Sequence, residues 1–115
     1  MRDIEWSKRF AKGFKRCKKR GYDMNKLYNI LDIIRSREFT TEEIYKYKVH
    51  KLNDDRRYTD CMELHIGGRN SDWLLIYHIS GNTVYFDDTT VGLENTGTHA
   101  DCFESEQIDN ELIWL

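Results

Sequence analysis

The chain has 115 residues, the usual size of one domain and long enough to bury a core. Hydrophobic residues make up 39% and aromatic residues 13%, which excludes a disordered chain, and no apolar run approaches the roughly 20 residues of a membrane span. The net charge of −2 hides a split, because residues 1–50 carry 14 basic and 7 acidic side chains, whereas residues 51–115 carry 4 and 13.

The N-terminal residues have no apolar signal-peptide core, so nothing predicts export. Ser7 is a good N-cap for a first helix, which Phe10 and Cys17 support at helical spacing and Gly21 ends. Lysine and arginine fill the exposed face of this helix between residues 8 and 20. The charge fits either a surface that binds an anionic partner or an ordinary solvated surface, and both stay open.

Asp23 caps a second helix, whose apolar stripe runs from Met24 to Ile34. The short joint between the two helices predicts an antiparallel helical hairpin, and each helix needs a sheet to cover its stripe. A further helical turn begins at Thr40, where Thr40 and Glu43 form a capping-box pattern.

From about Val49 the hydrophobic period changes to two, which is typical of strands. Residues 58–66 alternate and predict a strand with one buried face. Residues 72–79 are almost continuously apolar and predict a central strand.

The last third of the chain predicts shorter elements. A hairpin turn at Ser80-Gly81-Asn82 leads into a strand at residues 83–86. A polar loop over residues 87–95 and a short strand-like stretch at 96–99 follow. Residues 104–115 form an acidic tail with an apolar end, whose expected role is an added edge strand or a partner contact.

These elements together predict one α+β domain over residues 1–115, with a helical hairpin packed on one face of a mainly antiparallel sheet. The three cysteines, Cys17, Cys61 and Cys102, lack CxxC spacing, which fits a reduced cytosolic setting. Cys61 and His65 share a strand face, but further ligands at suitable spacing are missing, so no metal site is expected.

Four histidines are the candidate acid–base groups, because imidazole alone titrates near neutral pH without help. They are His50, His65, His78 and His99. Each of them can instead be a structural or surface residue, and the sequence alone does not show that they converge. His78, inside the predicted central strand, is expected to be structural.

Six segments between residues 2 and 103 follow the order of one known family. They are Arg2-Asp-Ile-Glu-Trp-Ser7, Asp23-Met-Asn-Lys-Leu27, His50-Lys-Leu52, Cys61-Met-Glu-Leu-His-Ile66, Asp72-Trp-Leu-Leu-Ile-Tyr77 and Thr96-Gly-Thr-His-Ala-Asp-Cys-Phe103. With these segments the chain resembles the RelE/ParE superfamily of bacterial toxins, and specifically its YafQ branch of ribosome-dependent mRNA interferases.

The resemblance implies a RelE-like fold and a type II toxin that cleaves mRNA in the ribosomal A site. The substrate's 2′-hydroxyl is the nucleophile in this family, so no metal and no cofactor is implied. On the matching positions, His50, His65 and Asp72 share base and orienting roles, and His99 is the general acid. The implied partners are an antitoxin, the ribosome and mRNA, in the bacterial cytoplasm and away from membranes.

The same resemblance implies that Trp73 and Phe103 pack the site or stack on a nucleobase. Two departures bear on substrate binding. Asn95 stands where the family usually has an Arg that stabilises the phosphate charge, and the preceding loop, residues 87–94, carries three carboxylates. Arg69, in a glycine-rich link slightly longer than the family's, either supplies the missing cation or is an ordinary exposed arginine.

Two other functions stay open. A RelE-like protein with weakened or lost catalysis would act by binding an antitoxin or the ribosome, and Asn95→Arg would then raise its activity. A ParE-like protein would inhibit DNA gyrase, but that branch lacks the catalytic histidines that this chain carries at three motif positions.

Overall fold

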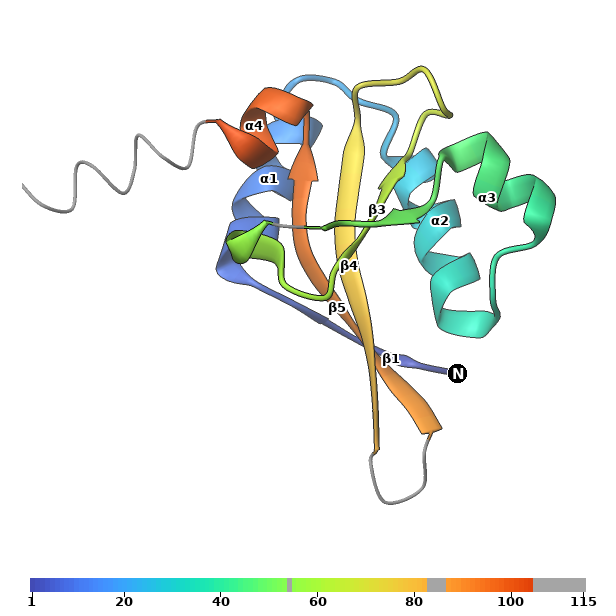
Figure 1. Cartoon of the computed structure of the whole chain (residues 1–115). Coiled ribbons are helices and arrows are strands. Elements are labelled where there is room, and N and C mark those ends of the chain that lie inside the picture. The colour runs from blue at the N-terminus through green and yellow to red at the C-terminus, as the bar shows by residue number, and fades with distance from the viewer. Residues whose placement is uncertain (54, 83–86, 105–115) are drawn as a thin grey trace, which may run out of the picture.

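A computed structural model, which describes residues 1–53, 55–82 and 87–104, contains a five-stranded sheet of order β1-β5-β4-β3-β2 (Figure 1). The strands are β1 (Asp3–Trp6), β2 (His50–Lys51), β3 (Met62–His65), β4 (Leu74–Asn82) and β5 (Asp87–Gly97). The helices are α1 (Lys8–Lys19), α2 (Met24–Ser36), α3 (Thr41–Tyr47), α4 (His99–Phe103) and the 3-10 turn η1 (Arg56–Tyr58). Neighbouring strands are antiparallel except β1 and β5, which are parallel, so the predicted α+β class is confirmed.

The helix starts are those predicted from the caps. The Ser7 side chain accepts a hydrogen bond from the Phe10 amide, and that of Asp23 accepts one from Asn25. Thr40 opens α3 with a complete capping box. Gly21, with a φ of +84°, follows the end of α1 and turns the chain into α2. The hydrogen bonds to the side chains of Ser7, Asp23 and Thr40 satisfy amides that the first turn of a helix leaves without partners.

The sheet is buried on both faces. On one face α1 and α2 cover a core made of Phe10, Cys17, Leu27, Ile30, Ile34, Leu64, Ile66, Trp73, Leu75, Tyr77, Val91 and Leu93. On the other face η1 and α4 contribute to a smaller cluster of Tyr58, Cys61, Leu74, Ile76 and Cys102. The central position of β4 and its burial on both faces confirm the prediction from its apolar run. The three cysteines are free and buried.

Three sequence predictions are wrong in the strands. In β3 both Glu63 and Leu64 are buried, so the strand does not have a single buried face. Residues 80–82 belong to β4 and not to a turn, and residues 87–95 belong to β5 and not to a polar loop. Polar residues form this strand because β4 on one side and β1 on the other pair with its backbone, which outweighs local propensity.

Other element boundaries also differ from the sequence predictions. The predicted strand over residues 58–66 begins later, at Met62, and residue 58 belongs to η1. Strand β1 was not predicted. Helix α4 begins at His99, the last residue of the stretch 96–99 that was predicted to be strand-like. The predicted strand 83–86 and tail residues 105–115 lie outside the described residues. Among the helices of the described ranges, none is long and apolar enough to cross a membrane.

Candidate active site

Strands β2 and β3 bring two imidazoles to one carboxylate. The Oε1 atom of Glu63 lies 3.5 Å from Nε2 of His50 and 3.7 Å from Nε2 of His65. The Nδ1 atom of His50 lies 2.7 Å from the Lys48 carbonyl oxygen, and that of His65 lies 2.6 Å from the Ser71 carbonyl oxygen. A carbonyl only accepts hydrogen bonds, so Nδ1 carries the hydrogen in both rings. Each Nε2 faces Glu63.

Glu63 is the part of this group that the sequence analysis missed. Its side chain is buried, at 6% relative exposure for the residue. Burial, together with smaller effects of the charges of Asp101 and Glu63, raises the pKa of Cys102 in α4 to about 12, so the charge of Glu63 is felt in α4. The two-residue spacing between Glu63 and His65, which puts both on one strand face, is the signal that predicts their association.

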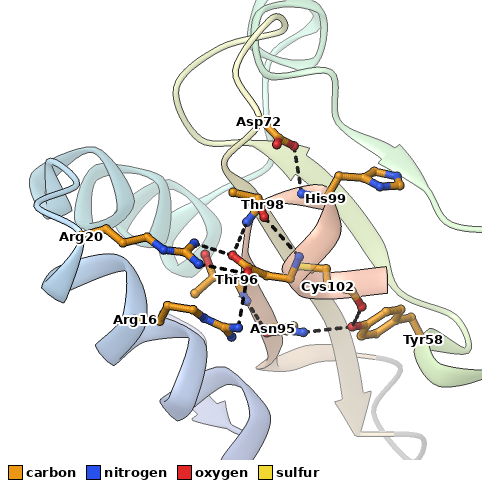
Figure 2. Close-up of polar contacts among 10 residues, drawn as sticks. Arg16, Arg20, Tyr58, Asp72, Asn95, Thr96, Thr98, His99 and Cys102 are labelled. Carbon is orange, nitrogen blue, oxygen red and sulfur yellow. Dashed lines mark hydrogen bonds and ion pairs between the residues drawn. The ribbon is translucent and has the colours of Figure 1, made fainter. Parts of the chain in front are cut away.

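A second group forms where the link after β3 meets α4. The Oδ1 atom of Asp72 accepts the backbone N–H of His99 at 2.9 Å (Figure 2). The exposed imidazole of His99 lies over Phe103, with ring centroids 4.7 Å apart. His65 holds the carbonyl of Ser71, the residue before Asp72, so a continuous chain of contacts joins the two groups. The four predicted catalytic residues therefore lie along connected segments at one end of the sheet.

A comparison with known proteins identifies the family. The family model described as "Bacterial toxin of type II toxin-antitoxin system, YafQ" matches residues 2–104. This chain belongs to the YafQ toxin family. The predicted family membership is thereby confirmed.

Individual YafQ proteins resemble the chain along most of its length. The mRNA interferase toxin YafQ of Escherichia coli strain B / BL21-DE3 is 34% identical over 104 residues, which cover 90% of this chain and 97% of the relative. The crystal structure of YafQ from E. coli BL21(DE3) matches with a TM-score of 0.69 at 31% identity, covering 90% of this chain and 99% of the other. The toxin of the E. coli DinJ–YafQ complex matches with a TM-score of 0.67, the same identity and the same coverage.

At the position where the YafQ resemblance leads one to expect Arg, Asn95 is an internal structural residue. It is 2% exposed, donates from Nδ2 to the Tyr58 hydroxyl at 3.0 Å, and accepts the Thr96 amide at Oδ1 (Figure 2). Tyr58 in turn donates to the carbonyl of Cys102 at 2.6 Å. Asn95 therefore joins β5, η1 and α4, and its burial supports a structural role, while contact with substrate stays a prediction.

Trp73, the second half of the YafQ-like Asp-Trp pair, lies in the core. Only 7% of the residue is exposed, its indole N–H donates to Oγ1 of Thr96 at 3.0 Å, and the Tyr22 ring packs edge-on at 4.9 Å. Of the two roles implied for Trp73, this geometry supports packing. Phe103 is more open, and its ring contacts His99 on one side and Tyr58 on the other.

Arg69 does not turn toward His99. Its Nε donates to the Tyr45 carbonyl at 3.1 Å, and its guanidinium carbon lies 4.3 Å from the Tyr45 ring centroid, in α3. A different cation lies near the YafQ-like site: Nη1 of Arg57 donates to the Phe103 carbonyl at 2.8 Å. The hydrogen bond from Arg57 outweighs partial burial and lowers the pKa of Asp55, its ion-pair partner.

Residues 87–94 do not form a loop in front of the site, because they belong to β5. At about 3.3 Å per residue, the backbone of Asp88 lies about 30 Å along β5 from Gly97. One residue, Thr98, separates Gly97 from α4. Glu94 pairs with His78 at 3.3 Å. His78 thus has a charged partner of its own. In the described ranges, no three His, Cys, Asp or Glu side chains are arranged to hold a metal ion.

Proposed function

We propose that this chain is the toxin of a type II pair and cleaves mRNA on the ribosome. The observation that supports it most is the pairing of His50 and His65 with Glu63, connected through the Ser71–Asp72 link to His99 in α4. Chains of the same family are mRNA interferase toxins by name. A set of imidazoles and carboxylates is the equipment that acid–base cleavage of a phosphodiester needs.

The proposed reaction uses a nucleophile that the RNA itself carries. A base removes the proton of the 2′-hydroxyl, the 2′-oxygen bonds to the adjacent phosphorus, and the bond from phosphorus to the 5′-oxygen breaks. An acid then protonates the leaving 5′-oxygen, which yields a 2′,3′-cyclic phosphate and a 5′-hydroxyl. Protons balance because the base gains the one that the acid loses.

The residues divide these roles by position. His50 and His65 present Nε2 as the base group, and the buried Glu63 orients them and stabilises the imidazolium that forms. His99, exposed at the start of α4, is the acid. Asp72 holds the backbone of His99 and thereby orients that imidazole. Phe103 with His99 offers a stacking surface to an unstacked base, and Arg57 brings positive charge to the same side.

An antitoxin is the proposed protein partner. The similar YafQ toxin has been solved in complex with DinJ. In this chain the lysine-rich face of α1 carries positive charge that either an acidic antitoxin segment or ribosomal RNA would neutralise.

The test is an in vitro translation reaction with a defined mRNA, in which primer extension maps the cuts. Wild-type protein is expected to cut in register with the codons, and His99→Ala is expected to lose about 100-fold or more in rate, because a positioned acid contributes that much. His78→Ala is the matched control, since His78 pairs with Glu94 and not with the site, and it is expected to cut normally. Unchanged cleavage by His99→Ala would show that another group is the acid.

The binding-only function has one observation in its favour, the burial of Asn95 at the position where the family resemblance implies an Arg. A folded wild-type protein that makes no cuts on ribosomes but binds an antitoxin would establish it. Inhibition of DNA gyrase in a supercoiling assay, together with intact mRNA, would establish the ParE-like function instead.

A further inference from the structure

The segment that carries His99 needs support from outside itself. Helix α4 has five residues, and a helix this short is not stable alone in water. His99 is its first residue, so the contacts that fix α4 also fix the position of the imidazole. The Asp72 carboxylate holds one end of this segment through the His99 amide.

Asp101 holds the other side of α4 and connects it to Arg16 and Arg20 at the end of α1. Its Oδ2 accepts the Thr98 amide at 2.9 Å, while the Asp101 amide donates to the Thr98 hydroxyl, which completes a capping box. The same carboxylate accepts two hydrogen bonds from Arg20, at 2.6 and 3.1 Å, and one from Arg16 at 3.4 Å. One side chain thus caps α4 and ties it to the last turns of a helix 81 residues earlier in the chain.

The ion pair lies in a partly buried setting. The Asp101 side chain is 11% exposed and that of Arg20 is 38% exposed. Burial alone would raise the pKa of Asp101, but hydrogen bonds from Arg20 and Thr98 lower it to about 2. Asp101 is therefore ionised at neutral pH and keeps its ion pair with Arg20 there.

We infer that Arg20, assisted by Arg16, is a positioning residue that holds His99 in place through Asp101. The inference rests on the proposed cleavage for its functional consequence. It also divides the basic residues of α1 into two kinds. Arg16 and Arg20 pair with Asp101 and support the site through it, while the lysines of α1 are exposed and available to an external anion.

The test compares Arg20→Ala with Lys46→Ala, which removes the same charge from an exposed position in α3, outside the lysine-rich face of α1. Misplacement of a reacting group by about 1 Å can reduce a rate 100-fold, so we expect Arg20→Ala to slow single-turnover cleavage at saturating ribosomes by roughly 10- to 100-fold. The ribosome concentration at half-saturation is expected to stay within about twofold of wild type, because positioning and not binding is lost. Lys46→Ala is expected to keep the saturated rate.

A double-mutant cycle tests whether Arg20 acts through Asp101. Asp101→Asn keeps an oxygen for the Thr98 amide but removes the charge that Arg20 pairs with. If the two residues act together, the variant with both substitutions is no slower than Arg20→Ala alone. Arg20→Lys, which keeps the charge without the two-pronged geometry, is expected to recover part of the rate.

Hydrogen exchange supplies a readout that does not depend on cleavage. The Cys102 amide donates to the Thr98 carbonyl within α4. Its exchange is expected to accelerate in Arg20→Ala and in Asp101→Asn, and to stay at the wild-type rate in Lys46→Ala. An unchanged exchange rate in Arg20→Ala would overturn the inference, as would a normal saturated rate with weakened ribosome binding. If wild type makes no cuts, the proposed function fails, while the exchange rates still decide whether Arg20 anchors α4.

Discussion

At the scale of single residues, the polar groups buried beneath α4 determine what position 95 does. A β-bulge between β4 and β5 puts Ile76 opposite Asn95 and Tyr77 opposite Leu93, which leaves Glu94 as the extra residue. Asn95 consequently faces the same side as Ile76, where its amide meets the Tyr58 hydroxyl. Every polar group in this small network has a partner, so the network specifies one arrangement of β5, η1 and α4.

Restoring the arginine that the family resemblance leads one to expect is a prediction at this scale. Asn95→Arg would place a guanidinium in a fully packed site and remove the hydrogen bond between Asn95 and Tyr58. We therefore expect a loss of several kcal/mol in unfolding free energy. Urea denaturation followed by tryptophan fluorescence measures it, with the exposed Asn70→Arg as the control, expected within about 0.5 kcal/mol of wild type. A stable and more active Asn95→Arg protein would instead place position 95 in contact with substrate.

At the scale of elements, helix α1 approaches β5 closely because Gly13 has no side chain. A Cβ atom at Gly13 would overlap the Thr96 carbonyl oxygen and lie 3.0 Å from Oδ1 of Asn95. The start of α1 is also tied to β5, since the Ser7 amide donates to the Leu93 carbonyl. The same helix reaches Asp101 at its other end. Helix α1 therefore aligns β5 and α4, the two elements that precede and carry His99.

Gly13→Ala tests this close approach, and the sign of its effect is informative. In a free helix the change stabilises by about 0.5–1 kcal/mol. Here the methyl group meets backbone that cannot move away, so we expect a net destabilisation of about 1–3 kcal/mol. Thermal and urea unfolding of Gly13→Ala, with the exposed Lys12→Ala as a near-neutral control, measure it. A stabilised Gly13→Ala would mean that α1 lies farther from β5 than described.

At the scale of the whole molecule, positive charge is concentrated in the first half of the chain. Five lysines of α1 are exposed: Lys8, Lys12, Lys15, Lys18 and Lys19. Strand β3, the link that precedes β4, and α4, in contrast, contribute the carboxylates Glu63, Asp72 and Asp101 around the site. RNA phosphates would therefore be attracted to α1. This surface would determine how the toxin is oriented on an RNA-rich partner.

Salt dependence decides between an RNA-binding surface and a merely solvated one. With Lys12 and Lys19 changed to Gln in a His99→Ala background, we expect weaker ribosome binding and a shallower slope of log affinity against log salt, by about one unit for each lost phosphate contact. Sedimentation with ribosomes between about 50 and 200 mM salt measures the slope. Lys46→Gln, an exposed lysine in α3, is the control and is expected to leave the slope unchanged. An identical slope for all variants would make the α1 lysines ordinary surface residues.

The sequence by itself determined the helix starts, the central strand and the family, because these rest on local bonds or on residues adjacent in the chain. Ser7, Asp23 and Thr40 each cap a helix through an amide two or three residues away, so the signal and its cause lie in one short window. The segments that begin at Cys61, Asp72 and Thr96 likewise pointed to His65, Asp72 and His99 without any knowledge of their contacts.

Only the tertiary structure decided which polar residues form strands and where side chains converge. Residues 87–95 contain only two large apolar side chains, Val91 and Leu93, and they form β5 because β4 and the distant β1 pair with them. The bulge at Glu94 turns Asn95 inward, and β2 pairing with β3 sets His50 against Glu63. Contacts such as Arg20 with Asp101 join residues 81 positions apart. Pairing partners and bulges are settled by packing over the whole chain, so no local pattern contains them.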